Sequence, residues 1–384
     1  MGATVLVLGG SGMAGGILAR LLLGESDATV VIAGRDEART ARTAAELGAE
    51  HGASRVSARR AAAADGAALD AAFRGVDLVA VASSTPAHAG TVADAALRAG
   101  ADYFDLQLST AAKIGTLEAL RRRLTTEGRC FITDGGIHPG LSAAMIRALL
   151  PAFGRVARAD AAGLMRADWS AYDIRPGTLN ELVDELRDFR VEALRDGVWR
   201  KVSSWDMQKR VDFGPPWGSE PCSLMYLEEM RRLPEVVPGL RDAGFYVAGF
   251  NKVVDYLFMP AGMVAMKVAP DRLGPPFSRA MLWGLRRFGA PPYGTVFQAD
   301  VEGEAPGGQG GRRAACLRVT HADAYFLTSA AAAACLLQYL DGTIRRPGLW
   351  LQGLAVAPGR FFTDLQRLGV GVAVRGAPEV AAGK

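Results

Sequence analysis

The chain has 384 residues, of which 49% are apolar and 22% are charged, and its 44 basic and 40 acidic side chains leave a net charge of +4. This length is ample for two domains with sizeable cores, and a small positive excess without a basic stripe argues against nucleic acid as a partner. The four cysteines lie far apart and form no CxxC pair, so we expect free thiols, no disulfide scaffold and no metal site.

A strand-like run at residues 4–8 begins the chain without a basic leader or a cleavage site. The longest apolar stretch, residues 327–340, is shorter than the roughly 20 residues that cross a bilayer. We therefore expect a cytoplasmic protein without a membrane span.

Short apolar runs alternate with helix-like segments in residues 1–135. The expected strands are residues 4–8, 29–33, 55–58, 78–82, 103–106 and 129–133. Helical spacing marks residues 15–23 and 110–127, and Gly100 and Gly128 stand where glycines end helices. Strands that are apolar throughout are buried on both faces, so the pattern predicts a Rossmann-type, doubly wound parallel sheet.

The pattern changes after about residue 150. A capping box at Thr178 opens an expected helix, and residues 296–301 and 314–320 predict an antiparallel hairpin around a glycine-rich loop. Helical spacing returns at residues 322–340. We therefore expect an α/β protein with a Rossmann domain at 1–135, an α+β domain for substrate binding and dimerisation at 136–321, and a helical segment at 322–384 that packs back on the first domain.

A glycine-rich turn follows the first strand. Gly10, Gly12 and Gly15 have the G-x-G-x-x-G spacing of dinucleotide-binding turns, and an apolar helix comes next. Gly10 permits the tight turn, Gly12 lets the backbone approach a pyrophosphate, and Gly15 lets helix and strand pack closely, while the helix offers free N–H groups to phosphates. The expected cofactor contacts are Gly10, Ser11, Gly12, Met13, Gly15, Gly34, Arg35, Asp65, Ser83, Ser84 and Thr85.

Arg35 follows the second strand, where enzymes that bind NAD usually carry an acidic residue for the ribose hydroxyls. A guanidinium there would pair with a 2′-phosphate, so the sequence favours NADP(H) over NAD(H). Two alternatives stay open. Asp36 could turn toward the ribose, and Asp65 could cap the next helix instead of meeting the adenine. The hydroxyl residues after the fourth strand are expected beside the nicotinamide ribose: Ser83, Ser84 and Thr85.

Hydride transfer needs a group that manages one proton beside the nicotinamide. His88, just past the fourth strand, and His138, in a Gly-Gly-Ile-His-Pro-Gly loop, are candidates because imidazole titrates near working pH. Each could instead order its own loop. Tyr103 and Asp105 alternate on one strand and point the same way, either into the site or as a core tyrosine and a strand-end cap.

Several segments share their pattern with one known family. Residues 5–12 and 33–35 look like its NADP-binding half, residues 99–105 like its "aG-x-x-Y-x-D" strand, residues 134–141 like its Pro-Gly loop, and residues 324–328 and 342–349 like its closing element. In these segments the chain resembles the saccharopine dehydrogenase family. Many relatives continue the Tyr-x-Asp strand with a Thr-Gly-Glu-like turn, whereas this chain reads Gln107-Leu108-Ser109 and lacks that carboxylate.

The resemblance implies an NADP(H)-dependent oxidoreductase that acts on a C–N bond, by reducing an imine or by oxidising an amine or amino acid. One alternative is a reductase of a C=C or C=O bond in a lipid-like substrate, and another is a non-catalytic NADP-binding regulatory or scaffold protein. The expected partners are a small-molecule substrate and a second copy of the chain in a homodimer. The substrate and the direction of the reaction stay open.

Two features of the second half are less specific. Arg166 and Arg175 flank a polar stretch, and either could bind a substrate carboxylate. Residues 245–266 are rich in aromatic side chains and methionine, which predicts protein core first and a dimer interface second. A substrate pocket and a lipid contact are further alternatives for this region.

Overall fold

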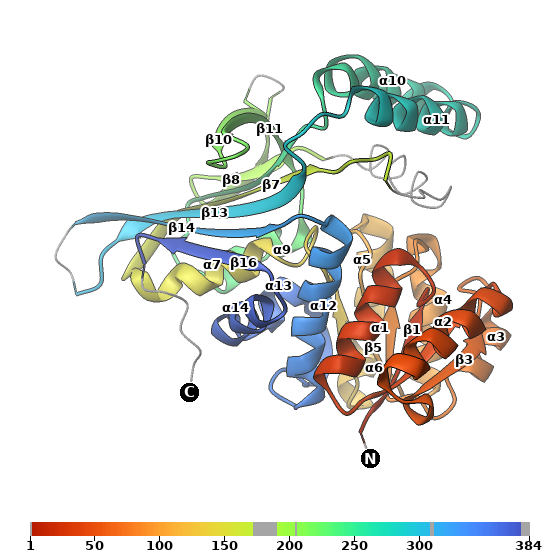
Figure 1. Cartoon of the computed structure of the whole chain (residues 1–384). Coiled ribbons are helices and arrows are strands. Elements are labelled where there is room, and N and C mark those ends of the chain that lie inside the picture. The colour runs from red at the N-terminus through yellow and green to blue at the C-terminus, as the bar shows by residue number, and fades with distance from the viewer. Residues whose placement is uncertain (1, 172–189, 204–205, 308–310, 378–384) are drawn as a thin grey trace. The chain divides into compact units, whose positions relative to one another are not determined.

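The computed structural model describes residues 2–171, 190–203, 206–307 and 311–377 (Figure 1). The chain divides into two compact units. Of the described residues, unit 1 comprises those in 2–144 and 325–369, and unit 2 comprises those in 145–324 and 370–377. The chain therefore leaves the first unit after Ala144, and its C-terminal part is shared between the two units.

Among the described residues, unit 1 is built on a seven-stranded sheet in which every paired strand is parallel to its neighbour. The strands are β1 (Thr4–Leu8), β2 (Thr29–Gly34), β3 (Val56–Arg60), β4 (Leu78–Val81), β5 (Asp102–Asp105), β6 (Cys130–Thr133) and β15 (Gly348–Leu351). Their order is β15-β6-β5-β4-β1-β2-β3, so the winding reverses between β1 and β4. This confirms the predicted Rossmann-type sheet, in which ligands bind beyond the carboxyl ends of the strands at the reversal point.

Helices connect these strands. They are α1 (Met13–Glu25), α2 (Glu37–His51), α3 (Gly66–Ala72), α4 (Ala89–Arg98), α5 (Ala111–Ala119) and α6 (Arg121–Thr126), with α12 (Ala324–Leu340) before β15. Two helices follow β15, namely α13 (Gln352–Ala355) and α14 (Pro358–Arg367), and α7 (Ser142–Leu149) begins at the end of unit 1 and continues into unit 2. Gly100 and Gly128 have φ values of +68° and +67°, which confirms their place at helix ends. The helix expected at 110–127 is interrupted at Leu120.

The core of unit 1 contains the central strands and the alanine-rich α12. Leu6, Val79 and Phe131 are completely buried, as are the small residues Ala330–Ala334. The Ser329 hydroxyl on α12 donates to Ala14 O at 2.9 Å, which joins this late helix to the start of α1. Tight packing of α12 follows because alanine side chains let neighbouring elements approach closely.

Unit 2 contains a mixed sheet of nine described strands in the order β10-β11-β12-β7-β13-β14-β16, with β8 paired to β12 and β9. The strands are β7 (Arg155–Arg166), β8 (Glu192–Arg195), β9 (Val198–Lys201), β10 (Gln208–Asp212), β11 (Ser219–Met225), β12 (Asp242–Ala248), β13 (Gly294–Glu304), β14 (Arg312–His321) and β16 (Gly371–Arg375). Its helices are α9 (Glu228–Arg231), α10 (Met259–Val268) and α11 (Pro270–Phe288).

The strands β13 and β14 pair antiparallel, which confirms the expected hairpin. The expected return of the C-terminal segment to the first domain is confirmed, because Tyr325–Gly369 belong to unit 1 and β15 pairs with β6. The last described strand, β16, is the exception, because it pairs with β14 in unit 2. An alternating valine pattern suits an edge strand, and the sequence analysis missed it. The helix expected after Thr178 lies outside the described residues.

The apolar region 245–266 is core only in part. Phe245 and Tyr246 lie on β12 with 1% and 3% of their surface exposed, whereas Tyr256 and Leu257 are 65% and 62% exposed. None of the described helices has the length and apolar character needed to span a membrane. The same residues contain no His, Cys, Asp or Glu cluster suited to a metal ion, and the four cysteines are free thiols.

Candidate functional site

The turn after β1 requires glycine at two of its positions. The Gly12 N–H donates to Gly9 O at 2.8 Å and closes the turn. A Cβ on Gly15 would overlap the Gly9 carbonyl oxygen, and a Cβ on Gly10 would lie 2.9 Å from Val7 O. Backbone cannot move aside as a flexible side chain can. A larger residue at Gly15 would therefore push α1 away from the turn, and one at Gly10 would push the turn away from β1.

The N-terminus of α1 fits an anionic ligand. Its N-cap is Gly12, and in the described chain no side chain caps its first turn and no acidic residue lies there. A Cβ on Gly12 would meet only Gly9 O within 4 Å, so the backbone is approachable at this position. The uncapped N–H groups and the helix dipole both favour a pyrophosphate. The residues present therefore fit a dinucleotide cofactor.

Cationic side chains mark the carboxyl ends of β2 and β3. Arg35 is exposed, and none of the described carboxylates forms an ion pair with it. Asp36 is the N-cap of α2, where its carboxylate accepts the Arg39 N–H at 3.0 Å. Arg60 is paired with Gly34 in the sheet register, so it ends at the same edge as Arg35. A phosphate on the adenosine ribose would find two guanidinium groups here.

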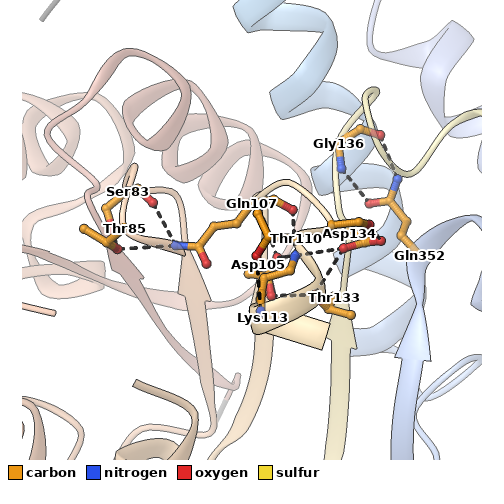
Figure 2. A network of polar contacts seen from close by, with 11 residues as sticks. Ser83, Thr85, Asp105, Gln107, Thr110, Lys113, Thr133, Asp134, Gly136 and Gln352 are labelled. Carbon is orange, nitrogen blue, oxygen red and sulfur yellow. Dashed lines mark hydrogen bonds and ion pairs between the residues drawn. The ribbon is translucent and has the colours of Figure 1, made fainter. Parts of the chain in front are cut away.

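The loop after β4 brings hydroxyl groups to the glycine turn. A Cβ on Gly9 would lie 2.8 Å from Ser83 N, which places Ser83 against the turn. Ser83 Oγ and Thr85 Oγ1 are 2.9 Å apart, and the Gln107 amide donates to Ser83 O at 3.0 Å and to Thr85 Oγ1 at 3.3 Å (Figure 2). Gln107 follows β5, so this network joins the carboxyl ends of β4 and β5. Ser84 is exposed.

A buried ion cluster lies at the carboxyl ends of β5 and β6 (Figure 2). The Lys113 ammonium lies 3.0 Å from Asp105 Oδ1 and 2.8 Å from Asp134 Oδ1, and the three side chains are fully buried. Lys113 also donates to Gln107 O at 2.7 Å. Thr133 Oγ1 donates to the other oxygen of Asp105 at 2.7 Å. One ammonium thus holds together the ends of two strands and the first turn of α5.

Burial and charge oppose each other in this cluster. Burial is the largest influence on Asp134 and raises the pKa of its carboxyl group, although Lys113 and the Ser109 hydroxyl oppose the shift. Burial alone would lower the pKa of Lys113, but the two carboxylates outweigh it and raise that pKa. Lys113 is therefore charged at neutral pH. A buried ion cluster of this kind is costly to break because removing one partner leaves an uncompensated charge.

The loop of residues 134–141 begins at this cluster and is fixed at several points. Asp134 has a φ of +57°, a conformation that Asp adopts more easily than most residues. The Gln352 side chain accepts the Gly136 N–H at 3.1 Å and donates to Gly136 O at 2.9 Å and Gly140 O at 3.1 Å. The loop is therefore held in one conformation by side chains from distant parts of unit 1.

His138 lies in this loop with both ring nitrogens screened from solvent. Burial lowers the pKa of the imidazole to about 4, so the ring is neutral at pH 7. A neutral imidazole does not offer the proton that an imidazolium would. The structure thus favours His138 as a hydrogen-bonding or loop-ordering group over the expected general acid.

Tyr103 and Asp65 have structural roles, whereas His88 is left available to the site. Tyr103 is fully buried and stacks on Phe131 with ring centroids 5.1 Å apart, so the structure favours a core tyrosine and we do not retain it as catalytic. Asp65 caps α3 by accepting the Ala68 N–H at 3.1 Å. His88 ends a short 3-10 turn beyond β4 and is partly exposed.

The expected carboxylate receptors do not gather at this site. Arg166 belongs to unit 2 and forms an ion pair with Glu220, with 2.9 Å between nitrogen and oxygen. Arg175 lies outside the described residues. Neither arginine is therefore assigned to substrate.

Sequence reasoning missed Lys113 and Gln352 as site residues. A signal for Lys113 was present. Thr110 caps α5 by accepting the Lys113 N–H at 3.1 Å, so the lysine lies in the first turn, where the helix dipole favours an acid. A lysine there indicates nearby carboxylates. No comparable local signal marks Gln352, which is far from the loop in sequence.

Comparisons with known proteins support this geometry. Residues 5–129 match the family model of the saccharopine dehydrogenase NADP binding domain. The apo structure of saccharopine dehydrogenase (L-Glu forming) from Saccharomyces cerevisiae is similar over 97% of this chain and 99% of that chain, with a TM-score of 0.68 and 16% identity. At this identity, the likeness concerns the fold.

Other similar structures cover far less of the chain. The RhlG/NADP complex of Pseudomonas aeruginosa covers 35% of this chain and 72% of that one, at 19% identity and a TM-score of 0.29. A short chain dehydrogenase from Mycobacterium smegmatis covers 34% and 75%, at 21% identity and a TM-score of 0.30. No curated protein sequence matches the chain.

Proposed function

Since residues 5–129 belong to the saccharopine dehydrogenase NADP-binding domain family, we propose that this protein is an NADP(H)-dependent oxidoreductase acting on a C–N bond. It would reduce an imine formed from an amine and a carbonyl compound, or oxidise an amine in the reverse direction. The observation that carries the proposal is the uncapped N-terminus of α1 behind a glycine turn, with Ser83 against that turn.

The cofactor supplies or accepts a hydride at the carbon of the C–N bond. The chain's own residues bind and orient it. The first N–H groups of α1 would receive the pyrophosphate beside Gly12, and Arg35 and Arg60 the 2′-phosphate. Ser83 and Thr85 would hold the nicotinamide ribose, because their loop adjoins the glycine turn.

Lys113, Asp105 and Asp134 are positioning residues in this proposal. They are fully buried, so they reach neither solvent nor substrate. Lys113 donates to Gln107 O, and the Gln107 amide holds the loop of Ser83. Because catalysis depends on the geometry of the reacting groups, a rigid support for this loop contributes to rate without contact with the substrate.

The proton is assigned to His88. This side chain is partly exposed and follows the loop of Ser83 and Thr85. An imine becomes a better hydride acceptor when its nitrogen is protonated, and imidazole is suited to that exchange. His138, neutral at pH 7, would order its loop or donate a hydrogen bond to substrate.

Cofactor preference is tested first by Arg35→Ala. We expect the Kd for NADPH to rise at least tenfold, since a charge-assisted contact with the phosphate is lost, while the Kd for NADH changes less than twofold. Arg42→Ala, an exposed arginine further along α2, is the matched control and should change neither value. An equal loss for both nucleotides in Arg35→Ala would refute the phosphate contact.

The reaction is tested by following NADPH oxidation with paired amines and carbonyl compounds. Turnover should require both partners, and His88→Ala should lower kcat at least a hundredfold while leaving the Kd for NADPH unchanged. His138→Ala should lower kcat less. Turnover without an amine would indicate reduction of a C=C or C=O bond instead, and binding without turnover of any substrate would favour a regulatory protein.

A further inference from the structure

A helical hairpin in unit 2 exposes apolar side chains to an unusual degree. It comprises a π-helical turn at Val254–Phe258 followed by α10 and α11, which lie side by side (Figure 1). Among the described residues, most of the large apolar side chains that are exposed belong to this hairpin: Tyr256, Leu257, Met263, Val264, Val268, Leu273, Trp283 and Phe288. This concentration marks a contact surface.

The two helices already use their inner faces to pack on each other. Gly262 of α10 lies against the Phe277 ring of α11, and Gly284 lies against the Phe258 ring, so the helices run antiparallel. The buried core between them contains Val254, Met266, Phe277, Met281 and Leu285. The exposed apolar side chains are therefore not needed to hold the hairpin together.

The inner faces determine where the other side chains project. In a helix each residue turns by about 100° from the one before it. With Gly262 facing Phe277, one side of the hairpin carries both apolar and basic residues, which we call the docking face: Leu257, Ala261, Val268, Arg272, Trp283 and Arg287. The Trp283 ring meets the Phe258 ring edge-on, with centroids 6.4 Å apart, which agrees with this orientation.

Positive charge surrounds this face. The hairpin and its start contain Lys252, Lys267, Arg272, Arg279, Arg286 and Arg287. A hollow of about 400 Å³ on α11 is lined by Arg279, Leu282, Trp283, Arg286 and Arg287. The acidic residues of the same stretch are Asp255 and Asp271. Asp255 is partly buried and accepts the Phe250 N–H at 2.9 Å, so it offsets little of the surface charge.

The positive charge of the docking face distinguishes between two candidate partners, a second copy of the chain and an anionic lipid surface. A second copy of the chain would bring like charges together, because a symmetric dimer places the same patch on both partners. An anionic lipid surface satisfies both parts of the docking face. Arginine binds phosphate, tryptophan is favoured at the headgroup level, and apolar side chains reach the acyl boundary.

We propose that this hairpin docks the protein on the surface of an anionic membrane, with apolar side chains such as Leu257 and Val268 entering the headgroup boundary and the α11 arginines binding lipid phosphates. The hairpin lies on the membrane and does not cross it. This proposal is independent of the reaction proposed above.

Sedimentation with vesicles tests the proposal on the full-length protein. The protein should bind vesicles of phosphatidylcholine and phosphatidylglycerol in equal parts, bind pure phosphatidylcholine more weakly, and be released as salt rises. Tryptophan emission should shift to shorter wavelength on binding, and Trp283→Phe should remove most of that shift. Failure to bind the anionic vesicles at low salt would overturn the proposal.

Paired substitutions separate the lipid contact from other outcomes. Arg279→Gln with Arg287→Gln should weaken vesicle binding about twenty-five-fold, from about fivefold for each cation removed near an anionic surface. Leu257→Asp with Val268→Asp should abolish it. These positions are exposed, so circular dichroism should show an unchanged fold.

The matched control is Val198→Asp, which changes an apolar residue on β9, 52% exposed and outside the hairpin. It should bind vesicles as the unaltered protein does. If Leu257→Asp with Val268→Asp instead dissociates a dimer and leaves vesicle binding unchanged, the docking face contacts a second copy and the proposal is wrong.

Discussion

Lys113→Met removes the ammonium that lies between two buried carboxylates, at a nearly constant side-chain volume. The lysine nitrogen lies 3.0 Å from Asp105 and 2.8 Å from Asp134, and all three side chains are fully buried. Breaking a buried ion pair by removing one partner costs about 3 to 5 kcal/mol. Because a whole domain is stable by only about 5 to 15 kcal/mol, urea unfolding should detect this loss easily.

The cost of Lys113→Met should also depend on pH. In the unaltered protein the pKa of Asp134 is raised, so the folded state holds that proton more tightly than the unfolded chain, and this group lowers stability as pH rises through the shifted pKa. The pKa of Lys113 is higher in the folded protein than in the unfolded chain. Protonated Lys113 therefore stabilises the fold at every pH below its unfolded pKa, and this contribution is lost only as pH rises through its folded pKa. Without the lysine, the pKa of Asp134 rises further because the opposing charge is gone, so the penalty should be smaller at pH 5 than at pH 8.

Arg98→Met is the matched control, because Arg98 and Asp70 form an ion pair of 2.7 Å with both side chains about half exposed. Its loss should cost less than about 1 kcal/mol. Adding Asp134→Asn to Lys113→Met should recover part of the stability, since one uncompensated charge is gone. If Lys113→Met costs no more than Arg98→Met, or costs the same at pH 5 and pH 8, the buried cluster does not have the electrostatic role described here.

Two further predictions concern the cofactor turn and the His138 loop. Gly15→Ala should raise the Kd for NADPH at least tenfold, because its Cβ overlaps Gly9 O. Gly16→Ala, whose Cβ would lie 3.5 Å from Gly10 O, should change it less than twofold, and similar effects would contradict the packing argument. The pKa of His138 is lowered to about 4, so the folded protein loses stability as pH falls from about 6.5 to 4. His138→Gln should remove up to about 3 kcal/mol of this acid sensitivity in urea unfolding, and an unchanged sensitivity would show that another group titrates.

Local sequence patterns were sufficient to predict most of the strands and the glycine turn of unit 1. The strands of its sheet are short, apolar and separated by helices, so their positions follow from periodicity with small errors at the ends. Gly10, Gly12 and Gly15 identify the cofactor turn because their spacing has a direct steric reason. The interruption at Leu120 was missed, since α5 and α6 together have one continuous helical pattern.

The features that could not be predicted from the sequence depend on contacts between residues that are far apart in the chain. Lys113 is one of 44 basic residues, and only the fold brings Asp105 and Asp134 to its ammonium. Strand β15 joins the first sheet from residue 348 onward, and four residues are too few for a reliable periodic signal. The composition of residues 245–266 predicted core, but Phe245 is buried in β12 while Leu257 is exposed on the hairpin. Composition alone does not distinguish a buried strand from an apolar surface.

Direct titration with nucleotides tests the NADP(H) site that the glycine turn and Arg35 are proposed to form. The purified protein would be titrated with NADPH and with NADH while nicotinamide fluorescence is followed. We predict saturable binding of NADPH, with a Kd at least tenfold lower than that for NADH, because one charge-assisted phosphate contact is worth at least about 1.4 kcal/mol. Equal affinity for the two nucleotides would contradict the role of Arg35, and binding of neither would contradict the site as a whole.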